Sequence, residues 1–105
     1  MKIATNSGIV LGKLDKDIYS FKGIPYAEPP VGKNRWLPTK PITPWSEIKD
    51  CTEYGPISPQ NETVYDNEAT SEFTQSLSNQ SEDCLSLNIW TPEIGDAKRP
   101  VMVWI

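Results

Sequence analysis

The chain has 105 residues and carries 14 acidic and 10 basic side chains, which gives a net charge of −4. This length suffices for one small domain, and no basic run is long enough to follow a phosphate backbone, which argues against a nucleic-acid partner. No apolar run approaches the roughly 20 residues that a membrane span needs, and residues 1–10 lack the apolar core of a secretory signal. We therefore expect a cytoplasmic protein with no membrane partner.

The first part of the chain has the pattern of a small antiparallel meander. Short apolar runs alternate with turn residues such as Asn6, Gly8 and Asp17. Three strands are predicted, over residues 2–5, 8–14 and 18–24. Pro25 ends the third strand, because a proline cannot donate to a strand ladder.

The middle of the chain is rich in proline. Six prolines fall between positions 25 and 44, and this density predicts an extended course over the surface of something larger. We expect Trp36 and Trp45 to clamp this stretch by burying aromatic area. Residues 46–50 and 51–54 are predicted to form brief strand or turn pieces.

Residues 58–80 are polar, with a weak helical period over residues 69–77. A polar loop of this length is usually functional or disordered. After it, residues 85–91 alternate between apolar and polar side chains, as a half-buried strand does. Glu82 and Asp83 stand at the entry of that strand, where they form either a solvated acidic turn or one half of a buried contact.

The run of five apolar residues at 101–105 predicts a strand buried on both faces, at the start of a central sheet. Residues 92–99, which contain Gly95, are then a hairpin connection. We expect such a run to continue into further chain, which makes residues 1–105 the N-terminal piece of a longer protein.

The sequence contains none of the common catalytic constellations. It has no histidine and no Gly-x-Ser-x-Gly motif, so a Ser-His-Asp/Glu triad cannot form within it. No Cys/His cluster indicates a metal, and no glycine-rich loop indicates a phosphate. We assign no catalytic, cofactor-binding or metal-binding residue to this chain.

Two longer motifs identify a family. Residues 21–32 read Phe-Lys-Gly-Ile-Pro-Tyr-Ala-Glu-Pro-Pro-Val-Gly and are followed by Arg35 and Trp36, while residues 82–88 read Glu-Asp-Cys-Leu-Ser-Leu-Asn. Together they strongly resemble the type-B carboxylesterases, the cholinesterase-like branch of the α/β-hydrolases. The resemblance covers almost the whole chain. It implies an α/β fold, of which residues 1–105 are the β-rich N-terminal part of an incomplete domain.

The resemblance implies a carboxylic-ester hydrolase that acts on a small-molecule ester. Its triad and its His-Gly-Gly-Gly oxyanion turn would lie beyond Ile105, so this part alone would be inactive. One alternative is a non-catalytic binding or adhesion protein of the same fold. Another is a stand-alone β-rich binding module.

The resemblance also implies roles for individual residues. Arg35 and Glu82 would form a largely buried ion pair that ties the proline-rich stretch to the strand at Leu85; the alternative is a solvent-exposed pair. Phe73 and Thr74 would lie in a loop near the mouth of the active-site gorge. Thr74 stands where cholinesterases carry a cation-binding tryptophan, which argues against choline esters.

Cys51 and Cys84 are the two cysteines of the chain. We prefer two reduced thiols to a disulfide, since cytosolic proteins rarely keep disulfides. In relatives the cysteine of the second motif is often bridged to a position that is occupied here by Ser58. Cys51 does not match that position.

Overall fold

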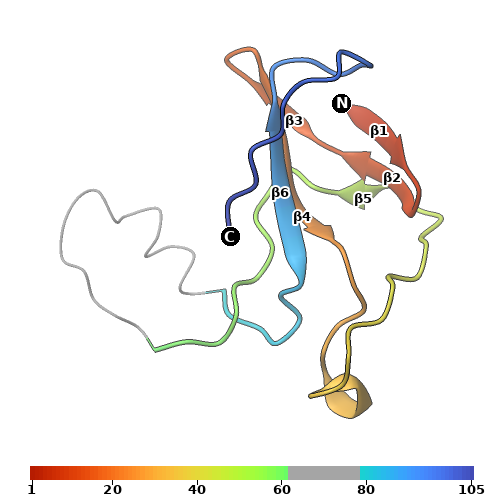
Figure 1. The fold of residues 1–105 in the computed structure, drawn as a ribbon, viewed down its shortest axis with the longest axis vertical. Helices are drawn as coiled ribbons and strands as arrows, with labels where there is room; N and C mark the ends of the chain where they lie inside the picture. Colours follow the sequence, from red (N-terminus) through yellow and green to blue (C-terminus); the bar gives the residue numbers. More distant parts are fainter. Residues whose placement is uncertain (62–78) are drawn as a thin grey trace.

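The computed structural model describes residues 1–61 and 79–105 and places them in two small sheets (Figure 1). The strands and the short 3-10 helix of the described residues are β1 (Lys2–Thr5), β2 (Gly8–Leu11), β3 (Lys13–Asp15), β4 (Ile18–Pro25), η1 (Gly32–Asn34), β5 (Lys49–Asp50) and β6 (Ser86–Thr91). The strand order is β1-β2-β5 in one sheet and β3-β4-β6 in the other. The predicted strand-rich character is therefore confirmed.

The pairing within the sheets is mostly antiparallel. In the first sheet β1 pairs antiparallel with β2, and the two-residue β5 lies parallel to β2. In the second sheet β4 is the central strand, antiparallel to both β3 and β6. The β4–β6 register shifts between Phe21 and Ile24, which marks an irregularity in β4.

The strand predicted over residues 8–14 is in fact two strands, β2 and β3, and they belong to different sheets. The break falls at Gly12, where an added Cβ atom would lie 2.4 Å from the ring of Phe21 and 2.6 Å from the carbonyl oxygen of Ser20. Only glycine permits this close approach. The first three strands therefore divide between two sheets, and the predicted single meander is corrected.

The hydrophobic core lies where the two sheets meet. Its buried members are Val10 of β2, Phe21 of β4 and Cys51, and the last has no exposed surface. Trp45 packs against this cluster and donates its indole N–H to the carbonyl oxygen of Ile9 at 3.0 Å. The predicted clamping role of Trp45 is thus confirmed.

We call residues 26–45 the Pro-rich strap. It leaves β4, turns at η1 and returns to β5, so that η1 lies far from the chain's N-terminus (Figure 1). Trp36 does not clamp it: its side chain is 95% exposed, and its φ of 64° belongs to a sharp turn. An indole this exposed buries almost no aromatic area against the strap, so the prediction for Trp36 was wrong.

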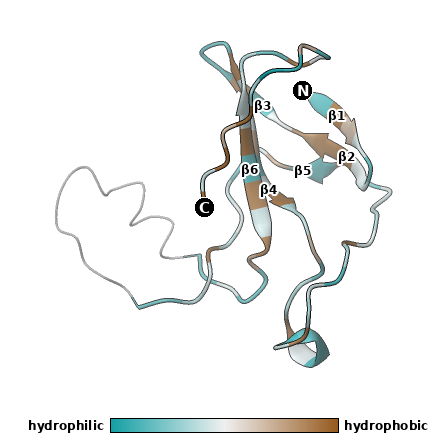
Figure 2. Cartoon of the chain, in the orientation of Figure 1, coloured by the Kyte–Doolittle hydropathy of each residue, from teal (hydrophilic) through white to brown (hydrophobic). Residues whose placement is uncertain are grey.

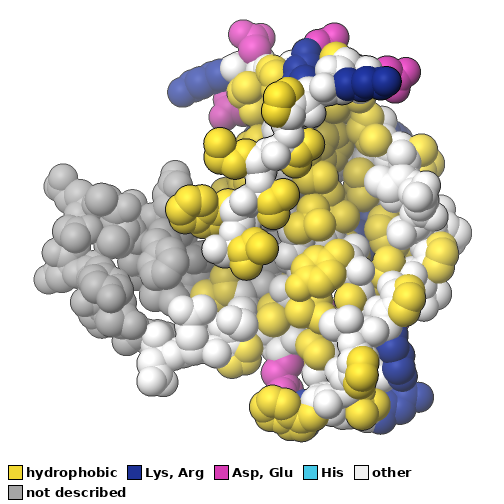
Figure 3. Space-filling view, viewed as in Figure 1, with side chains coloured by type: hydrophobic (Ala, Val, Ile, Leu, Met, Phe, Trp, Pro, Cys, Tyr) yellow, Lys and Arg dark blue, Asp and Glu magenta, His cyan; other side chains and the backbone are white. Residues whose placement is uncertain are grey.

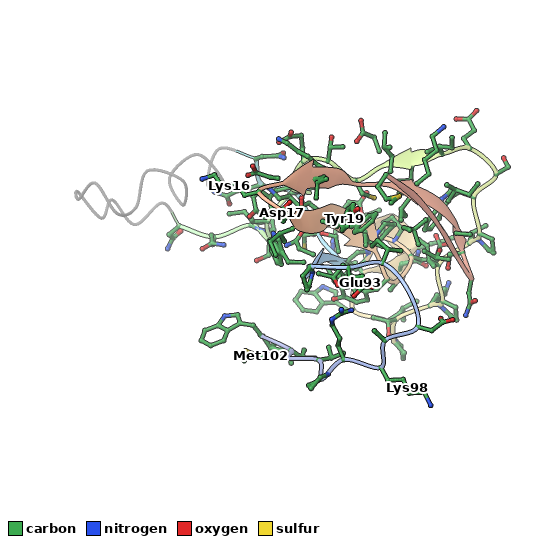
Figure 4. The ribbon with its side chains drawn as sticks, turned by 90° about the horizontal axis from the view of Figure 1, so that it is seen from above. Lys16, Asp17, Tyr19, Glu93, Lys98 and Met102 are labelled. Carbon is green, nitrogen blue, oxygen red and sulfur yellow. The ribbon has the colours of Figure 1, made fainter. Side chains whose placement is uncertain are left out.

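Residues 101–105 form no strand, contrary to the prediction, and their side chains are 75% exposed or more. The view from above shows Met102 standing apart from the strands (Figure 4), although the segment overlaps the region of β6 in the projection of Figure 2. A strand needs a neighbour that supplies backbone partners. No described segment does so here, and residues 92–99 are therefore not a hairpin connection.

Backbone contacts join the chain on the two sides of the polar segment. Ile57 forms a bridge with Gln80, and its N–H donates to the Asn79 carbonyl oxygen at 3.0 Å. The predicted helical period over residues 69–77, and with it Phe73 and Thr74, lies outside the described residues. In the described part of the chain, no helix has the length and hydropathy to cross a membrane.

The core predicts a contrast between neighbouring residues of β2. Val10 is 2% exposed and Ile9 is 40% exposed. Val10→Ala removes two buried carbons and leaves a cavity, so it should lower the free energy of unfolding by about 2 kcal/mol. Ile9→Val on the outer face should change it by less than about 0.5 kcal/mol. Urea denaturation checks both values, and equal effects would contradict this core.

Candidate functional site

Arg35 is positioned by the short helix η1. The helix begins at Gly32, whose φ of 55° lies in the left-handed region that favours glycine. Arg35 caps its far end and donates its backbone N–H to the Gly32 carbonyl oxygen at 3.2 Å. The turn therefore fixes the backbone from which the guanidinium group extends.

Glu82 is positioned by the turn that precedes β6. Ser81 donates its backbone N–H to the Ile57 carbonyl oxygen at 2.9 Å, which ties the turn to the base of the polar segment. The N–H of Asp83 donates to the Ser81 hydroxyl oxygen at 3.1 Å. Such serine-backbone turns hold a tight bend, and Glu82 is the residue between the two partners of this one.

The two side chains meet in a two-pronged contact between residues 47 positions apart. Nε of Arg35 donates to Oε1 of Glu82 at 2.8 Å, and Nη2 donates to Oε2 at 2.5 Å. This is the fork geometry in which the planar guanidinium group matches a carboxylate. The contact joins the Pro-rich strap to the entry of β6, so the two sequence motifs meet in space.

The expected burial of this pair does not hold in the described chain. The side chains of Arg35 and Glu82 are 46% and 47% exposed. Of the strap's residues only Ala27 is buried, so the segment that carries Arg35 lies at the surface of the described chain. Water therefore screens the charges of the pair. The pair contributes to stability through the specific geometry of the fork more than through Coulomb attraction.

The contact shifts both ionisation equilibria in the direction of the charged forms. The hydrogen bonds from Arg35 lower the pKa of Glu82, and the same bonds raise the pKa of Arg35. A carboxyl group whose folded-state pKa is lowered stabilises the fold above its ordinary pKa. That stabilisation is lost as the pH falls through the lowered value.

Two further polar contacts were not anticipated from the sequence. The Glu28 side chain accepts a hydrogen bond from the backbone N–H of Thr43 at 2.6 Å, across the strap. The Asn88 side chain of β6 accepts one from the N–H of Gly23 at 2.9 Å, at the irregularity in β4. Neither pair has a spacing that a sequence pattern could reveal, because both depend on tertiary approach.

Cys51 and Cys84 are both free thiols, which confirms the preferred reading of the sequence. Cys51 is fully buried, and this burial raises the pKa of its thiol. Cys84 is partly exposed at the entry of β6. A raised pKa and burial both make a thiol unreactive.

The described residues present no cluster of metal-ligating side chains. Among residues 1–61 and 79–105, no three His, Cys, Asp or Glu side chains gather closely enough to hold a metal ion. In Figure 3, apolar side chains spread over the middle of the visible face, and charged ones gather at two ends of the molecule. Phe73 and Thr74, the expected loop residues at the gorge mouth, are not among the described residues.

The sequence profile of the carboxylesterase family matches residues 1–105. The chain belongs to this family. The resemblance inferred from the two motifs is therefore confirmed, and so is the α/β-hydrolase fold class, of which the described residues form a strand-rich portion with almost no helix.

Relatives from distant organisms share this part of the family. The chain is 42% identical over 101 residues to a phenmedipham hydrolase of Pseudarthrobacter oxydans, and this match covers 96% of the chain and 20% of the relative. It is 40% identical over 110 residues to an acetylcholinesterase of Bungarus fasciatus, and this match covers 100% of the chain and 18% of the relative. The solved structure of a thermophilic para-nitrobenzyl esterase matches with a TM-score of 0.85 at 38% identity, and this match covers 99% of the chain and 20% of the esterase. The chain thus spans about a fifth of the length of these proteins.

The Arg35–Glu82 contact predicts a position-dependent effect on melting temperature. Arg35→Ala breaks a link between residues 47 positions apart, whereas Arg99→Ala breaks the pair of Arg99 with Glu93, only six positions away. A long-range link restrains more of the chain, so Arg35→Ala should lower the melting temperature more. Differential scanning calorimetry compares the two variants. Equal shifts would show that the Arg35 contact has no special structural role.

The two thiols should differ in reactivity. In the native protein iodoacetamide should alkylate Cys84, whereas Cys51 should react only after denaturation, because it is buried and its pKa is raised. Peptide mapping by mass spectrometry identifies the modified residue, and early alkylation of Cys51 would contradict the buried position.

Proposed function

We propose that residues 1–105 are the N-terminal portion of a carboxylic-ester hydrolase whose Ser-His-Asp/Glu triad lies beyond residue 105. Membership of the carboxylesterase family across all 105 residues is the observation that carries this proposal. The relatives support ester hydrolysis, since they include a para-nitrobenzyl esterase and liver carboxylesterases. The substrate class is a small-molecule carboxylic ester.

In this proposal the chemistry is supplied by other parts of the protein. A serine attacks the ester carbonyl, a histidine carries the proton, and backbone N–H groups stabilise the oxyanion. The chain contains no histidine, so it cannot assemble this triad alone. Its own contribution is to hold the strap and the entry of β6 in place through the Arg35–Glu82 contact.

The alternative from the same family is a binding protein that lacks the nucleophile. The described residues suit either function, because scaffold contacts do not depend on a serine elsewhere. The two proposals differ in one observable property, which is covalent reaction with a serine-directed phosphonate. An active serine hydrolase reacts with it, and a protein without the nucleophile does not.

The test is fluorophosphonate labelling of the whole protein that carries these residues, followed by peptide mapping. We expect one labelled serine, located outside residues 1–105, and parallel loss of p-nitrophenyl acetate hydrolysis. The isolated chain 1–105 should neither label nor hydrolyse the ester. A label on a serine within residues 1–105 would refute the assignment, and an unlabelled, inactive whole protein would refute the hydrolase and favour the binding alternative.

A further inference from the structure

Between its two ends the Pro-rich strap is held mainly by polar contacts. Trp45 at its end packs against the core, but of residues 26–44 only Ala27 is buried, so the middle of the strap gains little from the core. Segments with few buried apolar contacts open locally at a lower free energy than the sheets do. The positions of its hydrogen bonds therefore decide how the strap stays closed.

The two ends of the strap are fixed by backbone groups. Tyr26 donates its N–H to the Leu85 carbonyl oxygen at 3.1 Å, and Trp45 donates its N–H to the Ser7 carbonyl oxygen at 2.8 Å. These bonds involve no group that titrates in acid. The ends should remain attached whatever happens to the carboxyl groups between them.

The first carboxylate contact closes the strap on itself. Ala27 forms an isolated bridge with Pro41, and the N–H of Glu28 donates to the Lys40 carbonyl oxygen at 3.0 Å. The Glu28 side chain completes this closure by accepting the N–H of Thr43 at 2.6 Å. It therefore bonds the part of the strap that returns to β5 to the part that leaves β4.

The second carboxylate contact fixes the far end of the strap to the sheet. Arg35 follows η1 at the turn, and its fork with Glu82 joins that turn to the entry of β6. Within the strap, the Asn34 side chain of η1 donates to the Pro29 carbonyl oxygen and accepts a hydrogen bond from the Lys40 ammonium group. These two bonds lie within the strap and do not attach it to the sheets.

We propose that Glu28 and Glu82 act as two latches, and that protonating both opens the middle of the strap while the two sheets stay folded. The strap is then a conformational element that acid releases at defined points. This inference concerns the motion of the strap and does not depend on the proposed esterase activity.

The direction of the pH effect follows from the partners of each latch. Hydrogen bonds from Thr43, with a smaller contribution from the charge of Lys40, lower the pKa of Glu28, and Arg35 lowers that of Glu82. Both latches are thus fully closed above the ordinary glutamate pKa of about 4.3, and each opens as the pH falls through its lowered folded-state pKa. Asp50 also has a lowered pKa through its bonds to Thr52, so the amide of Thr52 cannot report on the sheets.

The test is hydrogen exchange of the whole protein, followed by mass spectrometry and corrected for the intrinsic pH dependence of exchange. Peptides from the strap should lose protection severalfold between pH 7 and pH 3. Peptides carrying the amides of Lys22 and Cys51, which bond to the Cys51 and Leu11 carbonyl oxygens, should keep theirs. Retained strap protection at pH 3, or loss in strap and sheets over the same pH range, would overturn the proposal.

Variants separate the latches from general acid unfolding. Glu28→Gln with Glu82→Gln keeps the shape of both side chains and removes their charge, so the strap should exchange faster already at pH 7, with little further change in acid. Glu47→Gln is the matched control, because no described residue hydrogen-bonds or pairs with Glu47, and it should behave as the wild type. A double variant with unchanged strap exchange at pH 7 would refute the latch role.

Discussion

The backbone of Cys51 is the constraint on which the rest of the structure depends. Its N–H donates to the Leu11 carbonyl oxygen at 2.8 Å, and its carbonyl oxygen accepts the N–H of Lys22 at 2.7 Å. One residue thus extends the first sheet and bonds to the central strand of the second. Because the residue has no exposed surface, both bonds are shielded from water, and an unmade bond there would be costly. The core of Val10 and Phe21 assembles around this point.

The remaining segments follow in chain order from the contacts of Cys51. Gly12 lets the chain pass from β2 to β3 against the ring of Phe21, and β4 then leads into the strap. The strap returns to β5, which runs directly into Cys51. The Arg35–Glu82 fork joins this loop to the entry of β6. A family signature composed of two separate motifs therefore describes one physical contact between them.

The sequence predicted those features that follow from local physics. Alternation of side chains located β6, Pro25 marked the end of β4, and the two motifs identified the family and its fold class. Features that depend on tertiary approach were missed. The split at Gly12 requires knowledge that Phe21 packs there, and the exposure of Trp36 follows from a left-handed turn. An apolar run at 101–105 suggested a strand, but strand formation depends on a neighbour.

We propose that these residues form a scaffold for chemistry located elsewhere in the protein. The most direct test of this claim is kcat for p-nitrophenyl acetate in the whole protein bearing Arg35→Ala, measured well below the melting temperature and normalised to folded active sites. A scaffold role predicts an unchanged kcat per active site, together with a lowered melting temperature. A large fall in kcat in fully folded protein would contradict the claim, because it would place Arg35 in the catalytic machinery.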